Sequence, residues 1–164
     1  MRAVVVVESY FGNASQVAET IATTLRERGA SVEVYDAASA PPRLEADLIL
    51  ICAPTHNLSL PSASSRAQAV QRGAPQPAEP GVQEWLDEVT ALTGRVVAIG
   101  TTAGSRFTGS AAKAIVKRVA RKGIRAERGP EFVVNATAGP LRTGEIERAR
   151  DWALSVVAGS SGQK

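Results

Sequence analysis

Hydrophobic residues follow two alternating patterns along the chain. Segments with hydrophobic residues at helical spacing separate short runs rich in β-branched residues. The runs, which are typical of strands, occupy residues 3–7, 32–35, 48–52 and 96–99, with a weaker one at 132–134. Parallel strands need crossover connections, and helices between successive strands supply them. The alternation therefore predicts an α/β domain built on a five-stranded parallel sheet.

The helical segments each carry one apolar stripe. In the first, Val17, Ile21 and Leu25 recur every four residues, and basic residues with Gly29 end the helix. A short amphipathic segment at 62–73 lengthens the crossover after the third strand and is a candidate lid or rim. The other stripes are Val82, Trp85, Leu86 and Val89; Ala112, Ile115, Val116 and Val119; and Ile146, Ala149, Trp152 and Val156. Their periodicity predicts that both tryptophans belong to the core.

Length and composition limit the class of protein. The chain has 164 residues, which fits one domain over residues 1–158, and we expect residues 159–164 to be a flexible tail. Its single cysteine, Cys52, lies in an apolar run and predicts a buried side chain in a reducing, cytoplasmic setting. We expect no membrane association, because no apolar run is long enough to cross a bilayer. A net charge of +3 does not identify a partner.

Topology predicts where a ligand binds. Five parallel strands with right-handed crossovers favour the doubly wound order 2-1-3-4-5, in which strands 1 and 3 flank the switch point. Ligands bind at the carboxyl ends of those strands, where the loops diverge. The two strand exits read ESYFGNAS and APTHNLSLPS, and they are the most polar in the chain. Loop composition and topology thus indicate the same site.

The first of these loops has the features of an anion site. Small residues that expose successive backbone N–H groups at the start of a helix attract phosphate, and the hydroxyls of Ser9 and Ser15 add donors. The dinucleotide fingerprint is absent, because the loop has only one glycine, Gly12. A segment at 104–111 has the glycine spacing of a nucleoside-triphosphate loop, but Ser110 replaces the lysine. We interpret it as a loop leading into a helix.

The motifs SYFGNAS and APTHNL, in a five-strand chain of this length, resemble flavodoxins and flavodoxin-like proteins that bind flavin mononucleotide (FMN). The resemblance covers nearly the whole chain. It implies that Ser9, Gly12 and Asn13 match the flavodoxin phosphate loop, whereas Phe11 and Ala14 fall where hydroxyl residues are usual. Ser15 is one residue beyond the second of these positions.

The resemblance also implies a set of FMN-binding residues on three loops. The second loop would contact the flavin ring, and the third would close over its other side. The set is Ser9, Tyr10, Phe11, Gly12, Asn13, Ala14 and Ser15 in the first loop, Pro54, Thr55, His56, Asn57 and Leu58 in the second, and Thr101, Thr102, Ala103, Gly104 and Arg106 in the third. The stacking Trp or Tyr usual in flavodoxins is missing, since the loops offer only His56, Leu58 and Phe107. The flavin would carry the redox chemistry, so no catalytic side chain and no metal is expected.

His56, the only histidine, has two interpretations. In the simpler one it faces water or caps a backbone carbonyl. In the other it lies beside the flavin, where its protonated form would favour the anionic reduced ring and make the potential depend on pH between about 5 and 8.

A basic stretch at 113–128 suggests where a partner would bind. Its only acidic residue is Glu127, and its basic residues are Lys113, Lys117, Arg118, Arg121, Lys122, Arg125 and Arg128. Such a run is usually a solvated helix face. Its functional interpretation is a surface for an acidic redox partner. Nucleic acid is disfavoured, because no aromatic residues are interleaved with the charges.

The sequence thus favours an FMN-binding electron-transfer protein, a carrier more than an enzyme with its own substrate, acting as a monomer or small homo-oligomer. A phosphoacceptor receiver domain shares the fold, but it needs clustered carboxylates for Mg²⁺, and Glu8 stands alone at the strand ends. Two further alternatives stay open. One is a domain with weak or lost FMN binding that serves as an interaction module, and the other is a flavoenzyme of the NAD(P)H:quinone oxidoreductase type.

Overall fold

The computed structural model describes residues 1–75, 80–104 and 109–160. It contains one parallel sheet in the order β2-β1-β3-β4-β5, which confirms the predicted topology. The strands are β1 (Arg2–Val7), β2 (Ser31–Asp36), β3 (Arg43–Pro54), β4 (Ala91–Thr102) and β5 (Ala126–Val133). The helices are α1 (Asn13–Glu27), α2 (Ala63–Gln71), α3 (Val82–Glu88), α4 (Ala111–Ala120) and α5 (Glu145–Ser160).

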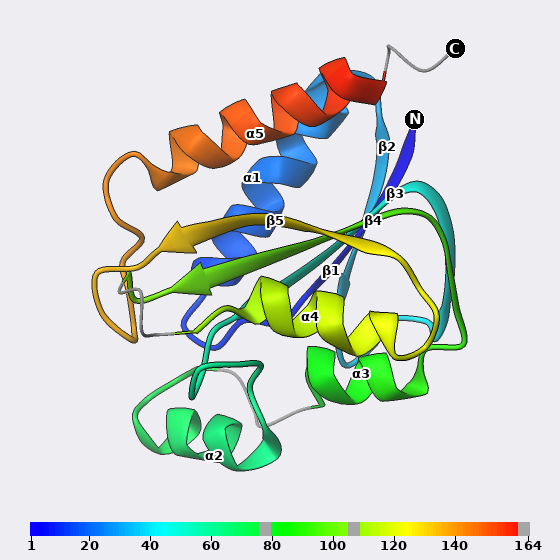
Figure 1. Ribbon diagram of the computed structural model, residues 1–164. Helices are drawn as coiled ribbons and strands as arrows, with labels where there is room; N and C mark the ends of the chain where they lie inside the picture. Colours follow the sequence, from blue (N-terminus) through cyan, green and yellow to red (C-terminus); the bar gives the residue numbers. More distant parts are fainter. Residues whose placement is uncertain (76–79, 105–108, 161–164) are drawn as a thin grey trace.

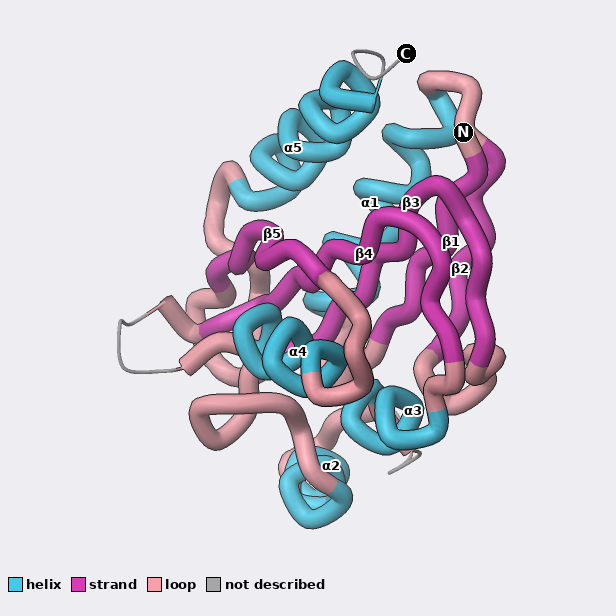
Figure 2. The backbone as a smooth tube through the Cα atoms, turned by 45° about the vertical axis from the view of Figure 1, so that its right-hand side comes forward, coloured by secondary structure: helices cyan, strands magenta, loops and turns pink. Residues whose placement is uncertain are grey.

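Helices cover both faces of the sheet (Figures 1 and 2). Helices α1 and α5 pack on one face, and α3 and α4 pack on the other. Successive residues of β1 and β3 contribute to both cores, because Val5 and Leu50 face the layer of α1 and α5, whereas Val4 and Ile51 face the opposite layer. This two-sided burial explains why the central strands are hydrophobic at almost every position. Helix α2 lies beyond the sheet, next to the loops at its carboxyl end.

Three strands are longer than their hydrophobic runs. Strands β3 and β4 each have 12 residues, and β5 starts at Ala126 instead of Phe132. Most of the added residues are polar or half-buried, although Leu44 and Ala53 of β3 are buried and apolar. A register shift between Glu45 and Leu48 also interrupts the pairing of β3 with β4. Hydrophobicity therefore marks the covered part of each strand and not its ends.

Several core predictions are confirmed. Trp85 is buried, and its indole Nε1 donates to the Pro41 carbonyl at 3.0 Å. Trp152 packs against the core formed by α1 and α5. Cys52 is buried, and desolvation raises the pKa of its thiol to about 12. Helix α5 continues to Ser160, so it includes the first two residues of the predicted tail, and residues 161–164 lie outside the described part of the chain.

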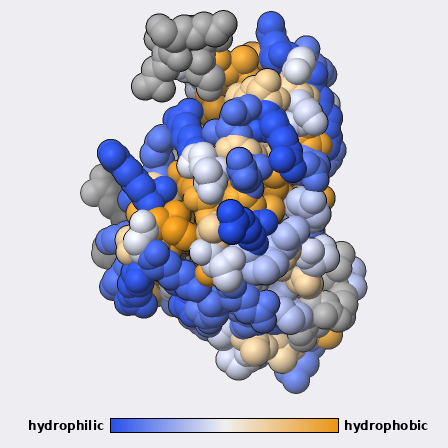
Figure 3. All heavy atoms as spheres, turned by 90° about the vertical axis from the view of Figure 1, so that its right-hand side faces the viewer, coloured by the Kyte–Doolittle hydropathy of each residue, from blue (hydrophilic) through white to orange (hydrophobic). Residues whose placement is uncertain are grey.

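The face at the amino ends of the strands is mixed in character. Hydrophobic residues show there as a band between polar side chains (Figure 3). Among the described residues, no helix combines the length and hydrophobicity that crossing a bilayer requires.

A buried ion-pair network holds α2 against the end of β1. The guanidinium of Arg66 donates to Glu8 Oε1 at 3.1 Å and also to the carboxylate of Glu84, and the Arg66 side chain is only 3% exposed. Glu8 Oε1 accepts a second bond from the Tyr10 hydroxyl at 2.9 Å, and its Oε2 accepts from the Val82 N–H at 2.9 Å. One carboxylate thus joins the end of β1 to the starts of α2 and α3.

Burial is the dominant influence on the Glu8 carboxyl. Desolvation raises its pKa, while the bonds from Val82, Tyr10 and Arg66 act in the opposite direction. The carboxylate also fills space that a larger neighbour would need, because a Cβ on Gly81 would lie 2.1 Å from Glu8 Oε1. The network therefore depends on the positive charge of Arg66, on its hydrogen bonds and on a glycine at position 81.

We expect Arg66→Leu to lower the free energy of unfolding by about 3 kcal/mol or more, because it leaves the Glu8 carboxylate buried without its cation. Adding Glu8→Gln to this variant should restore part of the loss, since the glutamine carries no charge. Urea unfolding of the four members of this double-mutant cycle measures both effects.

Arg95→Leu is the matched control. Its partner is Glu127, and both side chains are largely exposed, so the loss should stay below about 1 kcal/mol. Equal losses for Arg66→Leu and Arg95→Leu would show that the buried network does not stabilise the fold.

Candidate functional site

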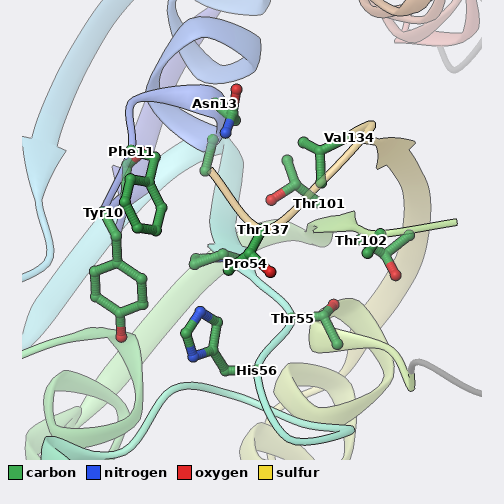
Figure 4. Close-up of a pocket in the computed structure, with 13 residues that line it drawn as sticks. Tyr10, Phe11, Asn13, Pro54, Thr55, His56, Thr101, Thr102, Val134 and Thr137 are labelled. Carbon is green, nitrogen blue, oxygen red and sulfur yellow. The ribbon is translucent and has the colours of Figure 1, made fainter. Parts of the chain in front are cut away.

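A cleft lies at the carboxyl ends of β1, β3 and β4, where the topology places it (Figure 4). Loops following four different strands form its walls. Its lining consists of Ser9, Tyr10, Phe11, Asn13, Ala14, Pro54, Thr55, His56, Thr101, Thr102, Ala103, Val134 and Thr137. Most of the residues predicted from sequence on the three loops are therefore brought together in one place.

The start of α1 presents free donors to this cleft. Gly12, the N-cap, has φ +89°, and no side chain caps the helix. The first backbone N–H with an intrahelical acceptor is that of Gln16, which donates to the Gly12 carbonyl at 2.9 Å. The preceding N–H groups of the first turn belong to the donors that a helix leaves without intrahelical partners. Together with the helix dipole they favour an anion at this point.

Ser9 adds an independent observation. Its Oγ is buried and has no hydrogen-bond partner in the described part of the protein, and the residue lines the cleft. A buried polar atom without a partner is costly in a folded protein, so such atoms often mark a ligand site. The hydroxyl and the uncapped helix start are on the same short loop, and both suit a phosphate-like group.

The second loop contains a tight two-residue turn. His56 and Ser59 exchange both of their backbone hydrogen bonds at 2.9 Å, and the central residues Asn57 and Leu58 have φ of +46° and +69°. Positive φ at both central positions is the geometry of a type I′ turn, which is unusual for a leucine. The Leu58 side chain is 65% exposed. Thr55 fixes the base of the loop, because its N–H donates to the Thr101 carbonyl at 2.8 Å.

His56 points into the cleft beside Tyr10 (Figure 4). The two rings meet edge to face, with centroids 5.1 Å apart. Burial lowers the pKa of the imidazole, and the nearby charge of Arg72 lowers it further. The imidazole is therefore mainly neutral at neutral pH. Since it is partly enclosed and lines the cleft, its position agrees with the second interpretation of this residue, whereas the flavin contact stays a prediction.

The structure describes the third loop as far as Gly104. Thr101, Thr102 and Ala103 line the cleft, while Gly104 does not. Arg106 and Phe107 lie outside the described residues. Ser110, from the segment with triphosphate-loop spacing, is the N-cap of α4 and accepts from the Lys113 N–H at 3.0 Å. Its role in capping α4 supports the interpretation of that segment as a loop leading into a helix.

Sequence reasoning missed a fourth loop, which follows β5. Val134 and Thr137 line the cleft from this side, and a Cβ on Gly139 would lie 2.5 Å from Asn13 Oδ1. The loop therefore packs closely on the start of α1. Its sequence, NATAGP at 135–140, has the same small and polar composition as the other loops. The composition of the segment after the fifth strand could therefore have identified this loop as part of the site.

The remaining predicted residues surround the cleft. Gly12 and Ser15 belong to the N-cap and first turn of α1, Asn57 lines a neighbouring pocket, and Leu58 points outward. The site offers hydroxyls, amide donors and one imidazole, and no carboxylate is among its described lining residues. This chemistry suits binding of a phosphorylated or otherwise anionic ligand more than acid–base catalysis.

Comparisons with known proteins support the fold. No protein-family model matches the chain, and no curated protein matches its sequence. Among solved structures, a flavodoxin from the domain Archaea is 15% identical with a TM-score of 0.65, covering 97% of this chain and 98% of that one. A Streptococcus pneumoniae TIGR4 flavodoxin is 21% identical with a TM-score of 0.63, covering 97% and 99%.

A third match is part of a larger protein. The rubredoxin oxygen:oxidoreductase from Desulfovibrio gigas is 14% identical with a TM-score of 0.62, and 98% of this chain aligns with only 36% of that one. The chain thus spans about a third of that oxidoreductase. At these identities the likeness concerns the fold, and the fold of this chain is that of the flavodoxins.

Proposed function

We propose that this protein binds FMN in the cleft and acts in electron transfer. The observation that carries the proposal is the phosphate end of the site, where the partnerless Ser9 hydroxyl and the uncapped start of α1 meet. Both lie at the switch point of a flavodoxin-like sheet. Bound FMN would supply the redox chemistry by accepting and releasing electrons.

The donors present fit the phosphate group. Backbone N–H groups of Asn13, Ala14 and Ser15 would hold its oxygens, and Ser9 Oγ would donate a further bond. Gly12 leaves open space next to this turn, because a Cβ there would meet no atom within 4 Å. The absence of hydroxyls at positions 11 and 14 lowers the number of donors but leaves the backbone donors in place.

We assign the flavin ring to the space between the second and third loops. His56, Thr55 and Pro54 would border it on one side, and Thr101 to Ala103 on the other. At pH values above the lowered pKa of His56, its imidazole is neutral and would add no charge to this side of the cleft. The Asn57–Leu58 peptide lies in a turn at the edge of the cleft, where it would be available to a polar edge of the ring.

We place contact with an acidic redox partner on α4 and the segment that follows it. Two of the basic residues stabilise the fold, since Arg118 pairs with Asp87 at 2.9 Å and Lys122 donates to the Val89 carbonyl at 2.9 Å. The residues that remain exposed for a partner are Lys113, Lys117, Arg121, Arg125 and Arg128.

FMN titration of the freshly purified protein tests the proposed function, with flavin fluorescence and the visible spectrum as readouts. We expect saturable binding at micromolar concentration or tighter, with much weaker binding of riboflavin because it lacks the phosphate. AMP serves as a control for a phosphate on a different base. No binding up to millimolar FMN would refute the proposal and favour an interaction module.

Ser9→Ala separates ligand binding from stability. Since Ser9 Oγ has no hydrogen-bond partner among the described residues, its removal should leave the free energy of unfolding of the ligand-free protein unchanged or slightly higher. The same change should weaken FMN binding about tenfold to a hundredfold, which corresponds to loss of one hydrogen bond to a charged group. Fluorescence titration and urea unfolding measure the two effects.

Ser155→Ala is the control for this experiment, because Ser155 lies on α5 away from the cleft and donates to the Trp152 carbonyl. It should leave FMN affinity unchanged. If Ser9→Ala also leaves the affinity unchanged, the Ser9 hydroxyl does not bind the phosphate.

A further inference from the structure

A second pocket adjoins the cleft on the side of α2. Its lining consists of Phe11, His56, Asn57, Ser65, Gln68, Ala69, Arg72 and Thr137. Three of these residues, Phe11, His56 and Thr137, also line the cleft, so the two spaces share a wall. Phe11, His56 and Asn57 belong to the FMN-binding set predicted from the resemblance, whereas Gln68, Ala69 and Arg72 have no predicted role in binding a ligand.

The lining divides into an apolar part and a polar part. Phe11 and Ala69 are neighbours in a small hydrophobic cluster with the buried Tyr10. Asn57, Gln68 and Arg72 add polar groups, and the lining residues that the structure describes include no carboxylate. An apolar surface with a few polar groups is the usual composition of a small-molecule site.

Among the described residues that line this pocket, Arg72 is the only charged one. It is the C-cap of α2, and its guanidinium has no ion pair with any carboxylate of the described residues. Its side chain is exposed, yet its charge acts on His56 across the pocket. The buried bond between Arg66 and Glu8 fixes α2, and therefore holds Arg72 on this side of the site.

We propose that this pocket binds a small organic anion, whose carboxylate pairs with Arg72 and whose apolar body lies against Phe11 and Ala69. Arginine suits this role, because its planar donors match the two oxygens of a carboxylate. Binding to the pocket does not require a flavin. Its use as a substrate or effector site beside the cofactor rests on the proposed function.

His56 provides a specific sign of such an anion. The groups that face it are Arg72 from α2 and the edge of Tyr10, whose hydroxyl donates to Glu8. The Glu8 carboxylate is itself paired with Arg66. A bound anion would offset the charge of Arg72 and favour the imidazolium, so the pKa of His56 should rise. By linkage, the anion should bind more tightly below that pKa than above it.

Benzoate is a suitable probe, and benzamide is its uncharged counterpart. His56 is the only histidine in the chain, so its imidazole proton signals in an NMR titration are assigned without ambiguity. We expect benzoate to shift these signals saturably and to raise the pKa of His56, whereas benzamide should do neither to a comparable extent. Arg72→Gln should weaken benzoate binding at least tenfold.

Arg43→Gln is the matched control, because Arg43 is an exposed arginine at the start of β3, at the end of the strand opposite to the cleft. It removes the same charge and should leave benzoate affinity unchanged. Equal weakening by Arg72→Gln and Arg43→Gln would overturn the proposal in favour of a general charge effect. Absence of any benzoate-dependent change at His56 up to tens of millimolar would also overturn it.

The experiment is independent of FMN binding. It is first done on the ligand-free protein, where a positive result supports the anion pocket even if FMN does not bind. Repeating it with saturating FMN shows whether both ligands bind together. FMN binding without any benzoate response would refute the anion pocket and leave the proposed function intact.

Discussion

The position of β1 between β2 and β3 is the constraint on which the site depends. From β1 the chain continues into α1 on one face of the sheet, and from β3 it continues toward α3 on the other face. The two loops must therefore separate where the strands end. Separation leaves a gap that side chains do not fill, and it exposes the backbone donors at the start of α1 to that gap.

Glu8 shows how one buried charge organises this region. It directly follows β1 and precedes Ser9, so the residue that anchors α2 is adjacent to the residue with the partnerless hydroxyl. Burying a carboxylate is unfavourable unless cations and donors surround it, and here Arg66, Tyr10 and Val82 do so. The arrangement fixes α2 and the aromatic wall of the cleft relative to the sheet.

The sequence was sufficient for the order of elements, because two-sided burial makes each central strand hydrophobic and each helix one-sided. It was insufficient for strand ends, since residues 43–47 and 91–95 are mostly exposed or half-buried and Leu44 is the one buried residue among them. The topology was sufficient to predict that the loops after β1 and β3 form the site. It did not predict the contribution of Thr137, because the loop after β5 reaches the site through its packing against Asn13.

The burial of Cys52 has a practical consequence for the dynamics of the sheet. This thiol lies in β3, between β1 and β4, and its raised pKa keeps it protonated and unreactive. A thiol reagent can reach it only when the core between the sheet and helices α1 and α5 opens. The rate at which the native protein is labelled therefore reports how often this core opens, with no engineered probe and no second cysteine to confuse the signal.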